Sequence, residues 1–249
     1  MKQRDKVWFM EETRKFDPVA VSDESTVVAQ YLHEPSKEQS YQSEAQLEAA
    51  LIRQLQAQAY EYADIRGSAA LEANLRLQLE KLNALTFSDN EWQVFFSSTI
   101  ASANDILINK TARIQEDHVQ LLHRDDGSTK NIRLIDKEHI HNNHLQVIHQ
   151  YGEQKTAGAG NRNRYDVTIL VNGLPLVHIE LKRRGVPLRE AFNQIDRYRD
   201  ESFSTGSALF DYVQIFVISN GTSTKYYSNT TRLAHVQENI RGSGRPDRR

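Results

Sequence analysis

The fold is decided by the stretch YDVTILVNGLPLVHIELK, residues 165–182, in which two β-rich runs flank Asn172-Gly173. An Asn-Gly pair between two such runs is a strong sequence signal for a tight antiparallel hairpin. Both runs are too apolar for a solvent-exposed edge strand, so we expect two strands inside a buried sheet.

Three charged side chains interrupt these apolar runs: Asp166, Glu180 and Lys182. Alternation puts Glu180 and Lys182 on one face of their strand, and the hairpin folds Asp166 back beside them. Two carboxylates form a hard oxygen site of the kind that Mg²⁺ prefers. An adjacent ammonium can orient a metal-bound water or stabilise negative charge that develops on phosphorus. The pattern favours phosphodiester hydrolysis, with all three residues catalytic and the two acids as metal ligands.

The register of this hairpin sets a condition on that interpretation. A strict two-residue turn pairs Asp166 with Ile179 rather than with Glu180. Convergence of the carboxylates therefore needs a bulge or a longer turn, and Pro175, which cannot donate to a strand ladder, favours such an irregularity. The alternative is a surface strand with solvated charges. The apolar context argues against it, because a buried charge needs a partner or a metal to offset its desolvation.

Upstream of the hairpin, the sequence predicts three helices between Ser43 and Ala103. Ser43 and Gln46 form a capping box for the first helix, and Ser88 and Glu91 form another for the third. The first two helices carry leucines at three- or four-residue spacing, at positions 47, 51, 55, 71, 75, 79 and 82. This spacing is typical of helices that bury one apolar face.

The remaining elements predict an α/β domain with a mixed sheet. Asp126-Gly127 indicates a second hairpin. Further strands are predicted at Val27–Leu32, Val119–Leu122, Ile132–Ile135, Leu145–His149 and Tyr212–Ser219. Residues 152–163 are expected to form a loop, and REAFNQIDRYRD after Pro187 to form a helix.

Three further groups are candidates for a functional site. Gln194 and Tyr198 lie four residues apart and so on one helix face. Glu44 and Glu48 share a face of the first helix, where the plainest interpretation is a favourable interaction with the helix dipole. Three histidines in a polar turn, at positions 139, 141 and 144, are interpreted as surface residues rather than metal ligands.

Composition narrows the class of protein. The 249 residues include no cysteine, which excludes disulfides, thiolate metal sites and cysteine nucleophiles. The chain has no apolar run long enough to span a membrane and no signal-peptide pattern at its start, so we expect a cytoplasmic protein. The net charge is −2, but the region 161–199 holds eight Lys/Arg and four Asp/Glu, a local charge of +4. A nucleic acid, if the protein binds one, would bind there, whereas the charge excess on its own favours a solvated face.

Around the predicted site, the sequence resembles a known family. RYDVTILVNGLPLVHIELKRRG, REAFNQIDRYRDESF and FVISNGT, with SYQSEAQLEAALI, NDILINKT and IRLIDK upstream, closely resemble the N-terminal nuclease domain of the restriction (R) subunit of type I restriction–modification enzymes. The resemblance covers about four-fifths of the chain, from roughly Tyr41. It implies a PD-(D/E)xK, restriction-endonuclease-like core, with a mixed central sheet flanked by helices and a helical insertion. Tyr165 stands where the superfamily has its proline, which this family commonly lacks.

The resemblance also implies residue roles. Asp166 and Glu180 match the metal-binding carboxylates and Lys182 the catalytic lysine, with Mg²⁺ as cofactor. Gln194 and Tyr198 match a Q-x-x-x-Y element that helps to position DNA or the catalytic groups. Arg183, Arg184 and Glu44 are supporting candidates, and Glu44 corresponds to a helix carboxylate that related nucleases place near the metal.

The implied organisation is a nuclease domain at residues 41–230, with a helical part at about 43–103 and a sheet core at about 117–230. Residues 1–40 would be an N-terminal extension, and 231–249 a linker towards a helicase motor. No G-x-x-x-x-G-K-[ST] loop is present, so ATP would be used by the full subunit and not bound here. The implied partners are double-stranded DNA, the modification and specificity subunits and the motor, in a prokaryotic cytoplasm.

Two other functions remain open at this point. One is a repair- or recombination-type nuclease with the same core. The other is a non-catalytic DNA-binding or subunit-docking module on the same fold. The Asp/Glu/Lys set argues against the second, because a docking surface has no use for buried acids.

Overall fold

The computed structural model describes the backbone of residues 16–21 and 27–32, and backbone and side chains of residues 43–152, 165–186 and 208–229. The predicted loop at 152–163 therefore lies almost wholly outside the described residues, and the predicted helix REAFNQIDRYRD wholly so. No described helix is long and apolar enough to cross a membrane.

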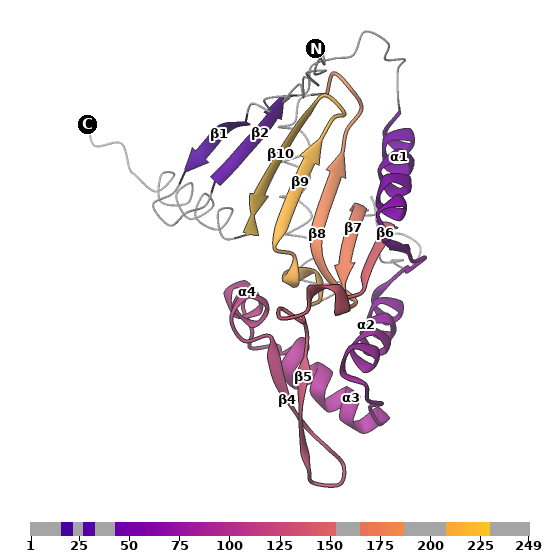
Figure 1. The fold of residues 1–249 in the computed structure, drawn as a ribbon, viewed down its shortest axis with the longest axis vertical. Coiled ribbons are helices and arrows are strands. Elements are labelled where there is room, and N and C mark those ends of the chain that lie inside the picture. The colour runs from indigo at the N-terminus through magenta and orange to yellow at the C-terminus, as the bar shows by residue number, and fades with distance from the viewer. Residues whose placement is uncertain (1–15, 22–26, 33–42, 153–164, 187–207, 230–249) are drawn as a thin grey trace, which may run out of the picture.

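A mixed eight-stranded sheet forms the upper half of the molecule in Figure 1, in the order β1-β2-β10-β9-β8-β7-β6-β3. The pairs β8–β9 and β3–β6 are parallel, and the other pairs are antiparallel. The strands are β1 (Phe16–Val21), β2 (Val27–Leu32), β3 (Glu61–Tyr62), β6 (Leu145–Tyr151), β7 (Tyr165–Val171), β8 (Leu174–Leu181), β9 (Ile215–Ser219) and β10 (Ser223–Ser228). The predicted mixed α/β class is confirmed, and β7 and β8 lie inside the sheet as expected.

Helices precede the sheet's central strands in the chain. They are α1 (Glu44–Ala57), α2 (Ser68–Asn83), α3 (Asp89–Phe95) with a π-helical continuation at Phe96–Ile100, and α4 (Leu107–Gln115). Both predicted capping boxes are present, Ser43 with Gln46 and Ser88 with Glu91. The helix α4 was not predicted, because it begins after Ile106 and so has no Ser, Thr, Asp or Asn at its N-cap.

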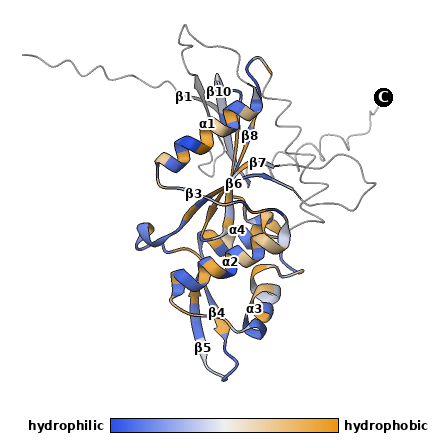
Figure 2. Cartoon of the chain, turned by 90° about the vertical axis from the view of Figure 1, so that its right-hand side faces the viewer, coloured by the Kyte–Doolittle hydropathy of each residue, from blue (hydrophilic) through white to orange (hydrophobic). Residues whose placement is uncertain are grey.

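Two apolar clusters hold these layers together. Ile52 and Leu55 of α1 pack with Val167 and Ile179 on one face of the sheet. The second cluster joins the other face to α2, α3 and α4, and includes Leu71, Leu75 and Leu79, which have no exposed surface. Figure 2 shows the corresponding alternation of hydrophobic and hydrophilic residues along α1 and α2.

The hairpin β7–β8 confirms the expected irregularity. Asn172 and Gly173 both have positive φ (51° and 84°), the conformation that a tight hairpin turn requires. The pairing shifts by one residue between Ile169 and Leu170, because Leu170 pairs with Pro175 while Ile169 pairs with Val177. A Cβ on Gly173 would lie 2.6 Å from the Leu75 Cα, so the turn packs directly on α2.

Several strands differ from the sequence predictions, which also lacked β1 and β3. The strand predicted at Tyr212–Ser219 is shorter, because a 3₁₀ turn at Phe210–Tyr212 precedes β9. The buried residues of this turn resemble an apolar strand in the sequence. The strand β10 was not predicted, since STKYYS carries few apolar residues. The second hairpin forms β4 (Val119–His123) and β5 (Thr129–Arg133), a separate sheet whose tip is hydrophilic in Figure 2.

Candidate active site

Glu180 lies in the middle of the sheet and has no exposed surface (0%). Its neighbours Ile179 and Leu181 pack with the α1 cluster. Alternation therefore directs Glu180 to the opposite face of β8. Its Oε1 accepts a hydrogen bond from Lys182 Nζ at 2.7 Å, so the predicted pair is in direct contact.

Asp166 reaches the same site because of the bulge in β8. Val167 pairs with Ile179, so one further step along this register places Asp166 opposite Glu180. The Asp166 Oδ2 accepts the Leu181 N–H at 2.8 Å. Burial, followed by the charge of Glu180, raises the pKa of Asp166 from 3.8 to about 8. Asp166 therefore carries a proton at neutral pH when no cation is bound.

Lys182 supplies the positive charge of the cluster. Burial disfavours its cationic form, but the negative charge and hydrogen bond of Glu180 outweigh burial and raise the pKa of Lys182. Asp166 adds to this effect. The lysine is therefore a fixed cation between two carboxyl groups.

Glu48 of α1, for which the sequence favoured an interaction with the helix dipole, is a further acid at this site. It is buried (5% exposed) and its negative charge adds to the rise in the pKa of Asp166. Its Oε2 accepts from Gln150 Nε2 at 2.9 Å and lies 4.0 Å from His149 Nε2. Gln150 has φ 53°, a left-handed conformation that non-glycine residues adopt rarely and that clusters at functional sites.

One sequence signal could have assigned Glu48 to the buried site. It lies four residues before Ile52, and Ile52 and Leu55 are the buried apolar residues of α1, while Leu47 and Leu51 are partly buried. The buried face of α1 therefore includes a carboxylate. A glutamate in phase with a buried helix stripe needs a partner or a ligand.

Of the supporting candidates from the sequence, Glu44, Arg183 and Arg184 are among the described residues. Glu44 Oε1 accepts the backbone N–H of Arg183 at 3.2 Å, so this carboxylate fixes the chain just after β8. The Arg183 side chain is exposed and that of Arg184 is half-buried. Gln194 and Tyr198 lie outside the described residues.

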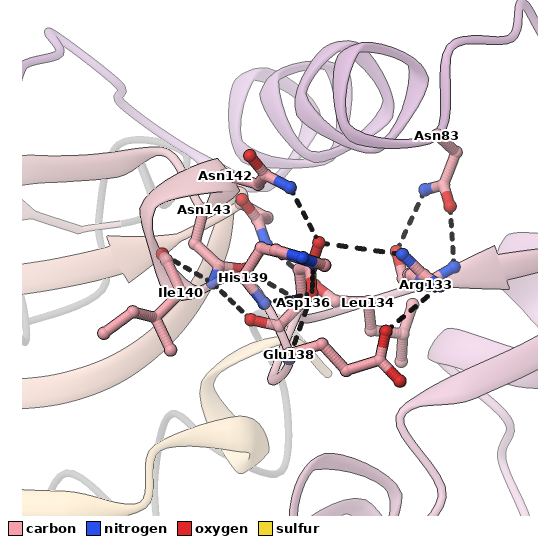
Figure 3. Close-up of polar contacts among 10 residues, drawn as sticks. Asn83, Arg133, Leu134, Asp136, Glu138, His139, Ile140, Asn142 and Asn143 are labelled. Carbon is pink, nitrogen blue, oxygen red and sulfur yellow. Dashed lines mark hydrogen bonds and ion pairs between the residues drawn. The ribbon is translucent and has the colours of Figure 1, made fainter.

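A second acidic group occurs in the loop after β5 (Figure 3), where Asp136, Glu138 and His139 lie close together. The Asp136 Oδ1 accepts the backbone N–H groups of Glu138 and His139, at 3.1 and 2.9 Å. Its Oδ2 accepts from Asn142 Nδ2 at 2.9 Å. These donors, the His139 N–H first, lower the pKa of Asp136 to about 2.

The Asp136 carboxylate therefore organises its own loop. Both of its oxygens already accept hydrogen bonds, so a cation would compete with these donors. His139 and His141 are exposed, as predicted for surface residues. His144 Nε2 contacts Glu61 Oε2 at 2.5 Å and is engaged at the edge strand β3.

The donor set around Asp166 and Glu180, in contrast, fits a hard divalent cation. Glu180 Oε2 is buried and has no hydrogen-bond partner. Metal binding requires the ionised form of a carboxylate, so a cation that binds here would replace the proton on Asp166. Two carboxylates with an adjacent ammonium are suited to binding a phosphate group with its metal.

Comparison with known proteins identifies one family for most of the chain. The family model described as "Type I restriction enzyme R protein N terminus" matches residues 41–235. The matched region contains every element from α1 to β10.

Individual relatives agree with that match. The chain is 46% identical over 216 residues to the type I restriction enzyme EcoprrI endonuclease subunit of Escherichia coli, covering 86% of this chain and 68% of that protein. It is 42% identical over 194 residues to the SsaAORF53P endonuclease subunit of Staphylococcus saprophyticus, covering 76% of this chain. It is 33% identical over 165 residues to the HindI endonuclease subunit of Haemophilus influenzae. The chain spans only 20% and 15% of the length of these last two relatives.

Proposed function

Because the chain belongs to the family of type I restriction enzyme R protein N termini, we propose that it is the Mg²⁺-dependent endonuclease part of a restriction subunit, hydrolysing phosphodiester bonds of double-stranded DNA. The fold proposed with this function is the restriction-endonuclease-like PD-(D/E)xK core. One observation carries the proposal: Glu180, fully buried, lies against Lys182 and opposite Asp166 on two adjoining central strands. Such a group of charges is costly in a sheet unless a ligand uses it.

The proposed roles follow from the contacts. Asp166 and Glu180 would hold Mg²⁺, which polarises the scissile phosphate and lowers the pKa of a bound water. Lys182 directs its ammonium into the same space and would stabilise the negative charge that develops on the phosphate. The hydrogen bond from the Leu181 N–H holds Asp166 in place before DNA arrives.

DNA would approach along the segment that follows β8. Arg183 and Arg184 belong to the local charge excess of residues 161–199 and would contact phosphates. Gln194 and Tyr198 would position DNA or the catalytic groups. We expect partial loss of cleavage on replacing either by alanine, and full rates in both variants would leave them a scaffold role only.

The proposal extends to the assembly named by the relatives. Cleavage would occur in an ATP-dependent type I complex with modification and specificity subunits, in a prokaryotic cytoplasm. ATP would be used by motor domains of the subunit, and DNA sequence choice would belong to another subunit.

The test is cleavage of circular duplex DNA by the complete complex with ATP and Mg²⁺, with ATP hydrolysis measured in parallel. Asp166→Ala should hydrolyse ATP at the wild-type rate and leave the circle intact. Glu116→Ala, which changes an exposed acid, is the matched control and should cut normally. Equal cutting by wild type and Asp166→Ala would make the charged cluster structural and favour a docking module.

A further inference from the structure

His178 lies beside the proposed site and has no role in the function proposed above. It is buried (1% exposed) and precedes Glu180 by two residues on β8, so both side chains lie on the same face of the sheet. Its Nε2 is 3.5 Å from Glu180 Oε2. Both atoms are buried and neither has a hydrogen-bond partner.

Two unpartnered polar atoms that face each other across 3.5 Å need an explanation. Each buried donor or acceptor left unpaired lowers the stability of the fold. A shift of roughly half an ångström would bring the two atoms within ordinary hydrogen-bond distance. The pair can therefore close with little movement when the Glu180 carboxylate turns.

The surroundings of His178 fix its ring. Thr168, its partner across β7–β8, places Oγ1 3.5 Å from His178 Nδ1. Tyr165 and Phe216 stand edge-on to the imidazole, with ring centroids 5.1 and 6.3 Å away and interplanar angles of 88° and 79°. The ring therefore has little freedom to rotate away from Glu180.

Hydrogen-bond chemistry then assigns the tautomer. An ionised carboxylate can only accept, so the nitrogen that faces Glu180 must carry the hydrogen. The Nδ1 atom is then an acceptor, which matches a hydroxyl donor on Thr168. One neutral tautomer satisfies both neighbours.

We infer that His178 is a positioning residue for Glu180, donating Nε2–H to one lone pair of Oε2 so that the carboxylate is fixed in the orientation that presents Oε1 to Lys182 and the other lone pair of Oε2 to a divalent cation. The inference rests on the proposed function, because it deepens the role of Glu180 in that site. Partners that orient a ligating carboxylate typically change metal affinity or activity by about 10- to 100-fold when removed.

The competing explanation is that His178 only fills space between aromatic rings. Two substitutions separate the explanations. His178→Leu keeps much of the apolar volume and removes the donor. His178→Gln keeps an N–H donor at about the Nε2 position, whereas His178→Asn keeps one only at about the Nδ1 position and cannot reach Glu180.

The experiment measures Mn²⁺ binding to the complete complex without nucleotide, by the electron paramagnetic resonance of free Mn²⁺. Wild type and Asp166→Ala define the signal of this site. We expect His178→Leu and His178→Asn to weaken this binding about 10-fold or more, and His178→Gln to restore most of it. The Mg²⁺ concentration that gives half-maximal cleavage should move in the same order, while the melting temperatures of the Gln and Asn variants stay close.

The outcomes separate the inference from the function on which it rests. Unchanged Mn²⁺ affinity in His178→Leu, in a complex where Asp166→Ala abolishes binding, would overturn the inference and leave the nuclease intact. If the leucine variant does not fold, equal affinities of the Gln and Asn variants would overturn it equally. If Asp166→Ala binds Mn²⁺ and cuts DNA as wild type does, the proposed function itself fails.

Discussion

Replacing Asp166 by asparagine should stabilise the metal-free chain at neutral and alkaline pH. The carboxyl group lies in a buried site beside Glu180, and these two effects raise its pKa to about 8. Asparagine keeps an oxygen that can accept the Leu181 N–H, but it cannot ionise. The substitution therefore removes an electrostatic penalty and keeps the local hydrogen bond.

The sign and size follow from linkage. Between pH 3.8 and about 8 the folded state holds a proton on Asp166 that the unfolded state has lost. The folding stability of the wild type therefore falls as the pH rises through this window. At about 1.4 kcal/mol per pH unit, the full penalty has an upper limit of about 6 kcal/mol. The advantage of the asparagine variant should grow up to about pH 8 and stay constant above it.

The assay is urea unfolding in EDTA from pH 5 to pH 9, followed by the fluorescence of the buried Trp92. Asp136→Asn is a matched control with the opposite sign, because backbone and side-chain donors lower the pKa of Asp136 to about 2. Its stabilising effect is complete above pH 3.8 and is lost only as the pH falls towards 2. The control should therefore be less stable than wild type by an amount that does not change across the assay range.

Lower stability of the asparagine variant would contradict this prediction. If Asp166→Asn were less stable than wild type at pH 9, Asp166 would be a structural acid whose charge the fold uses, as Asp136 is. A gain of at least about 1 kcal/mol, equivalent to roughly 2–4 °C in melting temperature, is expected instead. Saturating Mg²⁺ should abolish that gain, because the wild type alone keeps both carboxylates.

Three further substitutions test other parts of the structure. Lys182→Met should lower cleavage by the complete complex by on the order of 100-fold or more, and near-normal rates would remove the ammonium from the reaction. Lys110→Met should lower the free energy of unfolding by about 3–5 kcal/mol, because the buried Lys110 Nζ pairs with Asp211 Oδ2 at 2.7 Å; exposed Lys130→Met is its control in the same urea titration. Gly173→Ala should destabilise the chain more than Gly127→Ala does, since both glycines have similar positive φ but only Gly173 would clash with α2. Equal melting temperatures for the two alanine variants would contradict that contact.

The sequence predicted local features well where a short-range chemical signal existed. The Ser43 and Ser88 capping boxes and the Asn172-Gly173 turn are encoded within a few residues, and all three form as expected. The need for an irregularity in β8 also followed from register arithmetic alone. These features depend on neighbouring residues, so a single sequence contains the information.

Features that depend on distant residues could not be predicted in the same way. Glu48 contacts Gln150, which is 102 positions later in the chain, and this contact needs the left-handed backbone of Gln150. The residue type at position 150 does not signal positive φ, because glycine or asparagine would be its usual marker. The helix α4 was missed for a local reason, because its N-cap residue, Ile106, has no side chain that can cap the first turn.

The bulge at Leu176 determines whether the carboxyl groups of Asp166 and Glu180 lie opposite each other. Without the extra residue, Asp166 would lie opposite Ile179, whose side chain points to the α1 face, and the two carboxyl groups would separate across the sheet. The Leu176 carbonyl accepts the Gln214 N–H at 2.8 Å, just before β9. At the other end of the hairpin, Gly173 rests on Leu75 of α2. The helical region and β9 thus fix the one-residue offset that brings Asp166 and Glu180 together, so the charged cluster is a property of the whole sheet and its helices rather than of the E-x-K spacing.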